Sequence, residues 1–94
     1  MTRREKAQLL ILDEVYGRSG DQLGPDAPSL DAIGEFSEET VRSIAAEMIE
    51  ERLLAGEVQG SREVPDAVCP DGLTERGAEY RSMLRRRYER ASSV

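Results

Sequence analysis

The chain has 94 residues, a hydrophobic fraction of 38% and no Trp, so it has room for one small domain with a thin apolar core. Acidic residues number 19 against 13 Lys and Arg, and His is absent, which excludes His-based acid–base catalysis, a Ser-His triad and His metal sites. No apolar run reaches the roughly 18–20 residues of a membrane span. Cys69 is the single cysteine, so no internal disulfide can form, and we expect a cytoplasmic protein.

Charge is distributed unevenly along the chain. The first nine residues hold three cations and one acid, and the last fourteen hold five arginines and one acid, so residues 10–80 carry a net charge of −12. An acidic body with basic ends is unusual for a protein that grips the phosphate backbone of DNA. Neither a metal-ligand spacing nor a phosphate-binding Gly-rich loop is present, so we expect no cofactor and no enzymatic activity.

Residues 3–16 form the first predicted helix, because apolar side chains recur along it at helical spacing. One stripe contains Ala7, Leu10, Ile11 and Val15, and a second contains Leu9, Leu12 and Tyr16. A helix that is apolar over so wide an arc either forms the centre of its own domain core or also covers a second chain. The sequence leaves both interpretations open.

Residues 17–28 are rich in Gly, Pro and Asp and form a predicted loop. A short helix is predicted over residues 29–36, with Ser29 as its cap and Gly34 as a left-handed residue near its end. Ser37 is expected to cap the next helix, residues 37–53, because its hydroxyl can accept a first-turn amide. The apolar faces of these two helices comprise Leu30, Ile33 and Phe36, and then Val41, Ile44, Ala45, Met48 and Ile49.

Two strands are predicted near residues 54–59 and 66–69, joined by a loop over residues 60–64. Pro65 and Pro70 are expected to keep the second strand short and at an edge. Thr74 is the expected cap of a last helix, residues 75–90. Its apolar stripe comprises Tyr80, Met83, Leu84 and Tyr88, and an arginine cluster near its end comprises Arg85, Arg86, Arg87 and Arg90. These cations suit either the helix dipole or a phosphate or acidic partner, and residues 1–2 and 91–94 are expected to be disordered tails.

Two stretches carry a family resemblance. Residues 37–42, Ser-Glu-Glu-Thr-Val-Arg, lead to the helix exit Ile-Glu-Glu-Arg-Leu-Leu at 49–54, and Leu-Thr-Glu-Arg-Gly follows at 73–77. In this order and spacing they resemble the small winged helix-turn-helix family of bacterial, archaeal or phage type. The resemblance implies a single domain over residues 1–94, mainly α with a small β wing at residues 58–69.

The first functional hypothesis is a sequence-specific DNA-binding transcriptional regulator. The resemblance places helix 37–53 in the major groove of double-stranded DNA and the wing along the flanking backbone. Arg42 is then the main donor to base edges, and Arg62 the cation of the wing tip. The full set of expected DNA contacts is Ser37, Thr40, Arg42, Ser43, Ser61 and Arg62.

The second hypothesis is an acidic winged-helix module that binds a basic protein partner or mimics DNA, because Glu38, Glu39, Glu47 and Glu50 lie on or near the same helix face. Each of these carboxylates would meet a repulsive phosphate field on DNA. Under either hypothesis we expect a homodimer, because a chain of this size cannot cover all of its apolar stripes. The predicted dimer contacts are Leu9, Leu12, Tyr16, Tyr80, Leu84 and Tyr88.

Overall fold

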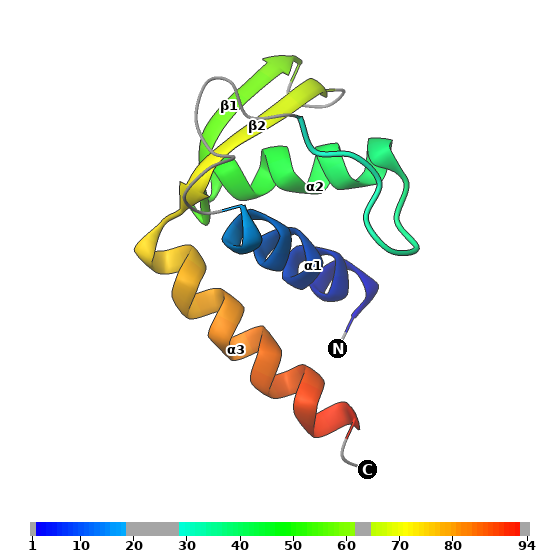
Figure 1. Ribbon diagram of the computed structural model, residues 1–94, viewed down its shortest axis with the longest axis vertical. Helices are drawn as coiled ribbons and strands as arrows, with labels where there is room; N and C mark the ends of the chain where they lie inside the picture. Colours follow the sequence, from blue (N-terminus) through cyan, green and yellow to red (C-terminus); the bar gives the residue numbers. More distant parts are fainter. Residues whose placement is uncertain (1, 19–28, 62–64, 93–94) are drawn as a thin grey trace.

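The computed structural model describes residues 2–18, 29–61 and 65–92. It contains three helices and one antiparallel pair of strands in the order α1, α2, β1, β2, α3 (Figure 1). Figure 1 shows α2 against one face of the two strands, and α1 between α2 and α3. The elements are α1 Arg3–Gly17, α2 Glu38–Glu50, β1 Leu54–Gly60, β2 Pro65–Leu73 and α3 Glu75–Ser92. None of the helices that the structure describes is long and apolar enough to span a membrane.

Helix α1 begins with a reciprocal cap. The Thr2 hydroxyl accepts the Glu5 amide, and the Glu5 carboxylate accepts the Thr2 amide, so two first-turn donors are satisfied. Thr2, which the sequence assigned to a terminal tail, is thus the N-cap of α1. Except for Tyr16, which is exposed, the residues of both apolar stripes of α1 pack against the core of the same chain. Helix α1 is therefore the central helix of the core.

The short helix predicted over residues 29–36 is absent. Instead the Leu30 amide donates to the Val68 carbonyl, and the Ser29 hydroxyl accepts the Val68 amide. Ile33 and Phe36 then bridge across a tight turn that contains Gly34 at φ 57°. An eight-residue segment is too short to hold a helix by itself, whereas the edge of β2 supplies backbone partners directly. The segment thus runs extended and still buries Leu30 and Phe36.

Helix α2 has the predicted cap, since the Ser37 hydroxyl accepts the Thr40 amide. It ends at Glu50 rather than at residue 53, because Arg52 is left-handed at φ 65°. The Leu53 amide then donates to the Met48 carbonyl, and the Arg52 amide donates to the Ile49 carbonyl. These two bonds satisfy the last turn of the helix and redirect the chain into β1.

Strand β2 is longer than predicted and includes both prolines. The Val68 amide and carbonyl face residues 29–30 rather than β1, and alternation along a strand gives Pro70 the same orientation. The missing Pro70 amide therefore removes no bond to β1. The pairing of β1 with β2 shifts register at two places, between Ala55 and Gly56 and between Gln59 and Gly60.

Helix α3 is anchored at its first turn. The Thr74 hydroxyl accepts the Gly77 amide, as predicted, and also donates to the Arg52 carbonyl. Gly77 lies so close to Leu53 that a Cβ there would be 1.8 Å from the Leu53 carbonyl oxygen. Leu84 is fully buried further along. The helix continues to Ser92, two residues further than the predicted end at residue 90.

Candidate functional site

Arg42 is the only cation of α2, and its guanidinium contacts three residues of the same chain. Its Nε donates to the Leu30 carbonyl at 3.0 Å, while Nη1 lies 2.5 Å from Glu38 and Nη2 lies 3.6 Å from Asp31. The side chain is 19% exposed. The guanidinium therefore joins the extended segment before α2 to the helix itself. To contact a base edge, Arg42 would have to give up these partners.

The other predicted DNA contacts that the structure describes lie on α2, at its cap and after β1. The Ser37 hydroxyl donates to the Thr40 hydroxyl at 3.0 Å, so this adjacent pair belongs to the helix cap. Ser43 is half-buried on α2, and Ser61 is exposed after β1. Arg62 lies outside the described residues. Among the five of these residues that the structure describes, a hydrogen bond joins Ser37 and Thr40.

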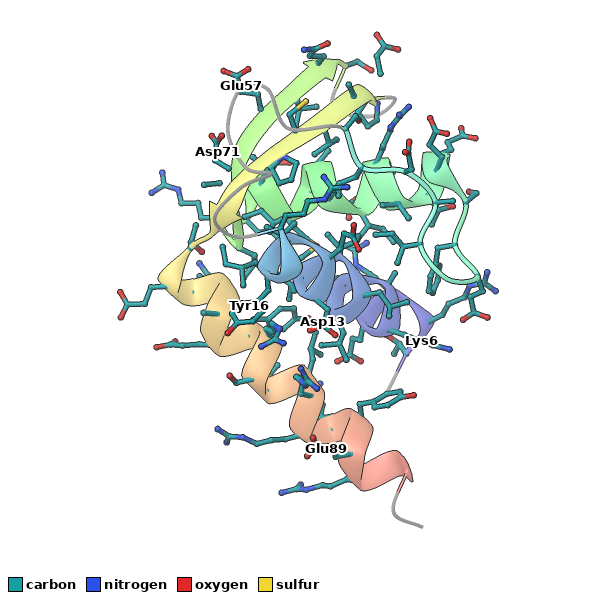
Figure 2. The ribbon with its side chains drawn as sticks, in the orientation of Figure 1. Lys6, Asp13, Tyr16, Glu57, Asp71 and Glu89 are labelled. Carbon is teal, nitrogen blue, oxygen red and sulfur yellow. The ribbon has the colours of Figure 1, made fainter. Side chains whose placement is uncertain are left out.

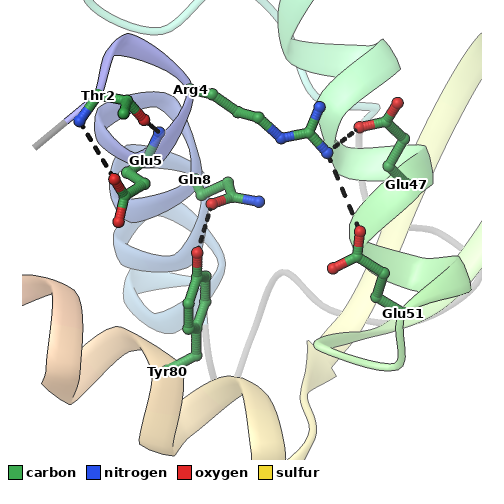
Figure 3. A network of polar contacts seen from close by, with 7 residues as sticks. All are labelled: Thr2, Arg4, Glu5, Gln8, Glu47, Glu51 and Tyr80. Carbon is green, nitrogen blue, oxygen red and sulfur yellow. Dashed lines mark hydrogen bonds and ion pairs between the residues drawn. The ribbon is translucent and has the colours of Figure 1, made fainter.

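The N-terminal cations are used within the chain. Arg4 pairs with Glu47 and lies 3.9 Å from Glu51, so it links α1 to α2 (Figure 3). Lys6 lies 3.1 Å from Glu35. The sequence shows a basic N-terminus, and in the structure the charges of Arg4 and Lys6 neutralise neighbouring carboxylates.

The C-terminal arginines similarly connect α3 to α1. Arg81 donates to Asp13 at 2.6 Å, and its guanidinium lies 4.3 Å from the centre of the Tyr16 ring. Arg85 lies 3.8 Å from Asp13, and Arg87 lies 2.5 Å from Glu5. The pKa of Glu5 is lowered from its ordinary value, first by the Thr2 backbone amide and also by Arg87.

A buried polar contact also joins α1 and α3. The Tyr80 hydroxyl donates to Gln8 Oε1 at 2.7 Å (Figure 3). Gln8 is 4% exposed, and burial raises the pKa of Tyr80. The sequence placed Tyr80 in the apolar stripe of the last helix and among the dimer contacts, and no sequence signal pairs it with a glutamine 72 residues away.

The structure corrects three of the predicted dimer contacts. Leu9, Leu12 and Leu84 are buried within the single chain, so their surfaces are already covered. Tyr80 is half-buried against Gln8. Within the described residues, the exposed large apolar side chains are Tyr16, Met83 and Tyr88. Self-association thus remains a prediction, and the apolar surface available for it is smaller than the sequence suggested.

The outward side of α2 and the strands is acidic. Helix α2 contains four Glu, β1 contains one Glu and β2 contains two Asp, whereas Arg42 is the one cation among these elements. Glu39, Glu50 and Glu57 are exposed, and Glu57 points outward from β1 (Figure 2). The sequence indicated the carboxylates of α2, but the position of the strands beside them depends on the fold.

A groove of about 290 Å³ lies between α2 and β1. Its lining is largely apolar, with Glu50 at the margin: Ala46, Ile49, Glu50, Val58 and Gly60. We name these five residues the α2–β1 groove. The sequence analysis did not predict this groove, because Ile49 belongs to a predicted helix and Val58 to a predicted strand.

Among residues 2–18, 29–61 and 65–92, no three His, Cys, Asp or Glu side chains are grouped so that they could hold a metal ion. Comparison of the chain with protein-family models, with curated proteins and with solved structures finds no match. The geometry of the α2–β1 groove and its carboxylates is therefore the basis for a functional assignment.

Proposed function

We propose that this protein is a winged-helix-like interaction module whose α2–β1 groove binds a basic segment of a partner protein. The order of three helices with an antiparallel strand pair before the last helix supports the winged-helix comparison. The extended segment at residues 29–36 departs from it, since a helix-turn-helix has a helix there. The binding face, however, depends on α2 and β1 alone.

One observation carries the proposal: α2, β1 and β2 hold seven carboxylates. Glu38 and Glu47 pair with Arg42 and Arg4, and the exposed side chains Glu39, Glu50 and Glu57 keep this side of the molecule acidic. Such a surface repels phosphate and attracts Lys and Arg side chains. The groove beside Glu50 adds apolar area of the kind that fixes a partner in place. Charge and shape together favour a basic peptide over duplex DNA.

Fluorescence anisotropy tests the proposal with two labelled probes, a Lys-rich peptide with interspersed Val and a random-sequence DNA duplex. At an ionic strength of about 0.15 M, where distant surface charges are largely screened, the peptide should bind and the duplex should not. Glu50→Lys should weaken peptide binding at least about tenfold. Glu79→Lys, an exposed change of equal charge on α3, should have a much smaller effect.

Two outcomes would overturn this assignment. Equal losses in Glu50→Lys and Glu79→Lys would mean that the peptide responds only to overall charge. Duplex binding that is lost in Arg42→Ala while Arg42→Ala remains folded would instead support the DNA-binding regulator hypothesis.

A further inference from the structure

The two strands differ in how their outer edges are covered. Figure 1 shows β2 between β1 and the segment that begins at Ser29. Ser29 and Leu30 bond to Val68 and so occupy the outer edge of β2. In the part of the chain that the structure describes, no backbone hydrogen bond joins the outer edge of β1 to another segment. An open strand edge is a template for pairing with another chain.

The pairing register identifies which groups of β1 are available. Val68 directs its amide and carbonyl away from β1, toward residues 29–30. Its register partner is Val58. In an antiparallel pair, opposite residues either both bond to each other or both point outward. The Val58 amide and carbonyl therefore point to the open edge, whereas those of Glu57 and Gln59 face β2.

Within residues 2–18, 29–61 and 65–92, nothing gives the outer edge of β1 the usual protection of an edge strand. Exposed edges are commonly guarded by Lys, by Pro or by a covering segment. Residues Leu54–Gly60 contain no Pro and no cation, and Glu57 is their single charge. Gly56 and Gly60 leave the backbone uncovered by side chains of their own. The edge would thus accept a strand that carries positive charge and would repel an acidic one.

The α2–β1 groove lies beside this edge. Val58 lines the groove and is partly buried against the core, so its side chain points toward α2. Glu57 is exposed on the opposite face of the strand. Residues directly opposite in a ladder direct their side chains to the same face. A residue paired with Val58 would consequently direct its side chain toward the groove, and its two neighbours would lie on the Glu57 face.

We propose that the partner segment binds in extended form and adds a third strand at the outer edge of β1. An apolar side chain opposite Val58 enters the α2–β1 groove, and basic side chains on either side of it face Glu57. The recognised chemistry is a segment of alternating apolar and basic residues. This inference rests on the proposed function and specifies the conformation and the pattern of the partner.

Amide hydrogen exchange measured by NMR tests the inference directly, with an acetylated and amidated peptide of alternating Lys and Val as the probe. In the free protein, the Val58 amide should exchange quickly, and the Glu57 and Gln59 amides should exchange slowly. A saturating amount of the peptide should slow exchange at Val58 at least about tenfold. Fast exchange at Val58 in the complex, or slow exchange at Val58 in the free protein, would overturn strand addition.

Two substitutions separate the backbone bond from the side chain. Val58→Pro removes the outward amide and leaves the bonds of Glu57 and Gln59 to β2 intact. Val58→Ala removes groove contacts and keeps the amide. Val58→Pro should bind the peptide at least about tenfold more weakly than Val58→Ala. Equal affinities of two folded variants would contradict the inference, and the exchange measurement on the unsubstituted protein decides the matter if Val58→Pro does not fold.

A second peptide distinguishes this inference from the proposed function. It has the same charge, but Lys and Leu are placed at helical spacing. If this peptide binds in a Glu50-dependent manner and the alternating peptide does not, the acidic groove is a binding site and strand addition is wrong. If neither peptide binds, both the proposed function and the strand addition are wrong.

Discussion

Replacement of Arg42 by Ala should destabilise the fold substantially. The variant removes a charge-assisted hydrogen bond to the partly buried Leu30 carbonyl, and bonds of this kind contribute about 1.5–3 kcal/mol. The pair with Glu38 is exposed on the acid side and four residues apart, so it adds about 0.2–0.5 kcal/mol. Asp31, at 3.6 Å and largely exposed, adds little. We expect a loss of about 2–3 kcal/mol.

Urea denaturation followed by far-UV circular dichroism measures this loss. Glu38→Ala is the matched control, because it removes only the exposed pair and should cost about 0.2–0.5 kcal/mol. Arg42→Lys keeps a positive charge but lacks the planar fork that reaches Leu30 and Glu38 together, so it should fall between the two. A loss below about 0.5 kcal/mol in Arg42→Ala would refute the bracing role and leave Arg42 free for another one.

Three further substitutions test the contacts between elements. Gly77→Ala places a Cβ 1.8 Å from the Leu53 carbonyl oxygen, so thermal unfolding should show a loss of at least about 3 kcal/mol; a loss near zero would mean that α3 does not approach Leu53. Arg52→Gly relieves a left-handed residue and should stabilise the protein by about 0.5–1 kcal/mol in urea; destabilisation would contradict the turn assigned after α2. Tyr80→Phe leaves buried Gln8 without its donor and should cost about 1–3 kcal/mol, whereas Tyr88→Phe, at an exposed position, should have little effect.

Local features were the most predictable part of the fold. Ser37 and Thr74 cap their helices as expected, because a cap depends on residues within one turn. Apart from the helix predicted over residues 29–36, the order of helices and strands is the predicted one. The helix over residues 29–36 was wrong because its alternative partner, Val68, is distant in sequence. Helix propensity is a local property, and it contains no information about the hydrogen bonds that Val68 offers to this segment.

The candidate site was harder to predict because its residues depend on tertiary contacts. The winged-helix resemblance placed Arg42 at the base edges of DNA. The Leu30 carbonyl that binds it is presented only by the extended segment. Leu12 and Leu84 were assigned to a dimer, yet the packing of α1 against α3 covers both within one chain. The α2–β1 groove likewise exists only after α2 and β1 meet.

The most direct test of the central claim is an NMR titration of isotope-labelled protein with the alternating Lys-Val peptide, repeated with a DNA duplex. The proposal predicts that the peptide shifts the amide signals of Ile49, Glu50 and Val58, and that the duplex leaves them unchanged at an ionic strength of about 0.15 M. Peptide-induced shifts confined to other elements, or duplex-induced shifts along α2 in the absence of any peptide effect there, would contradict it.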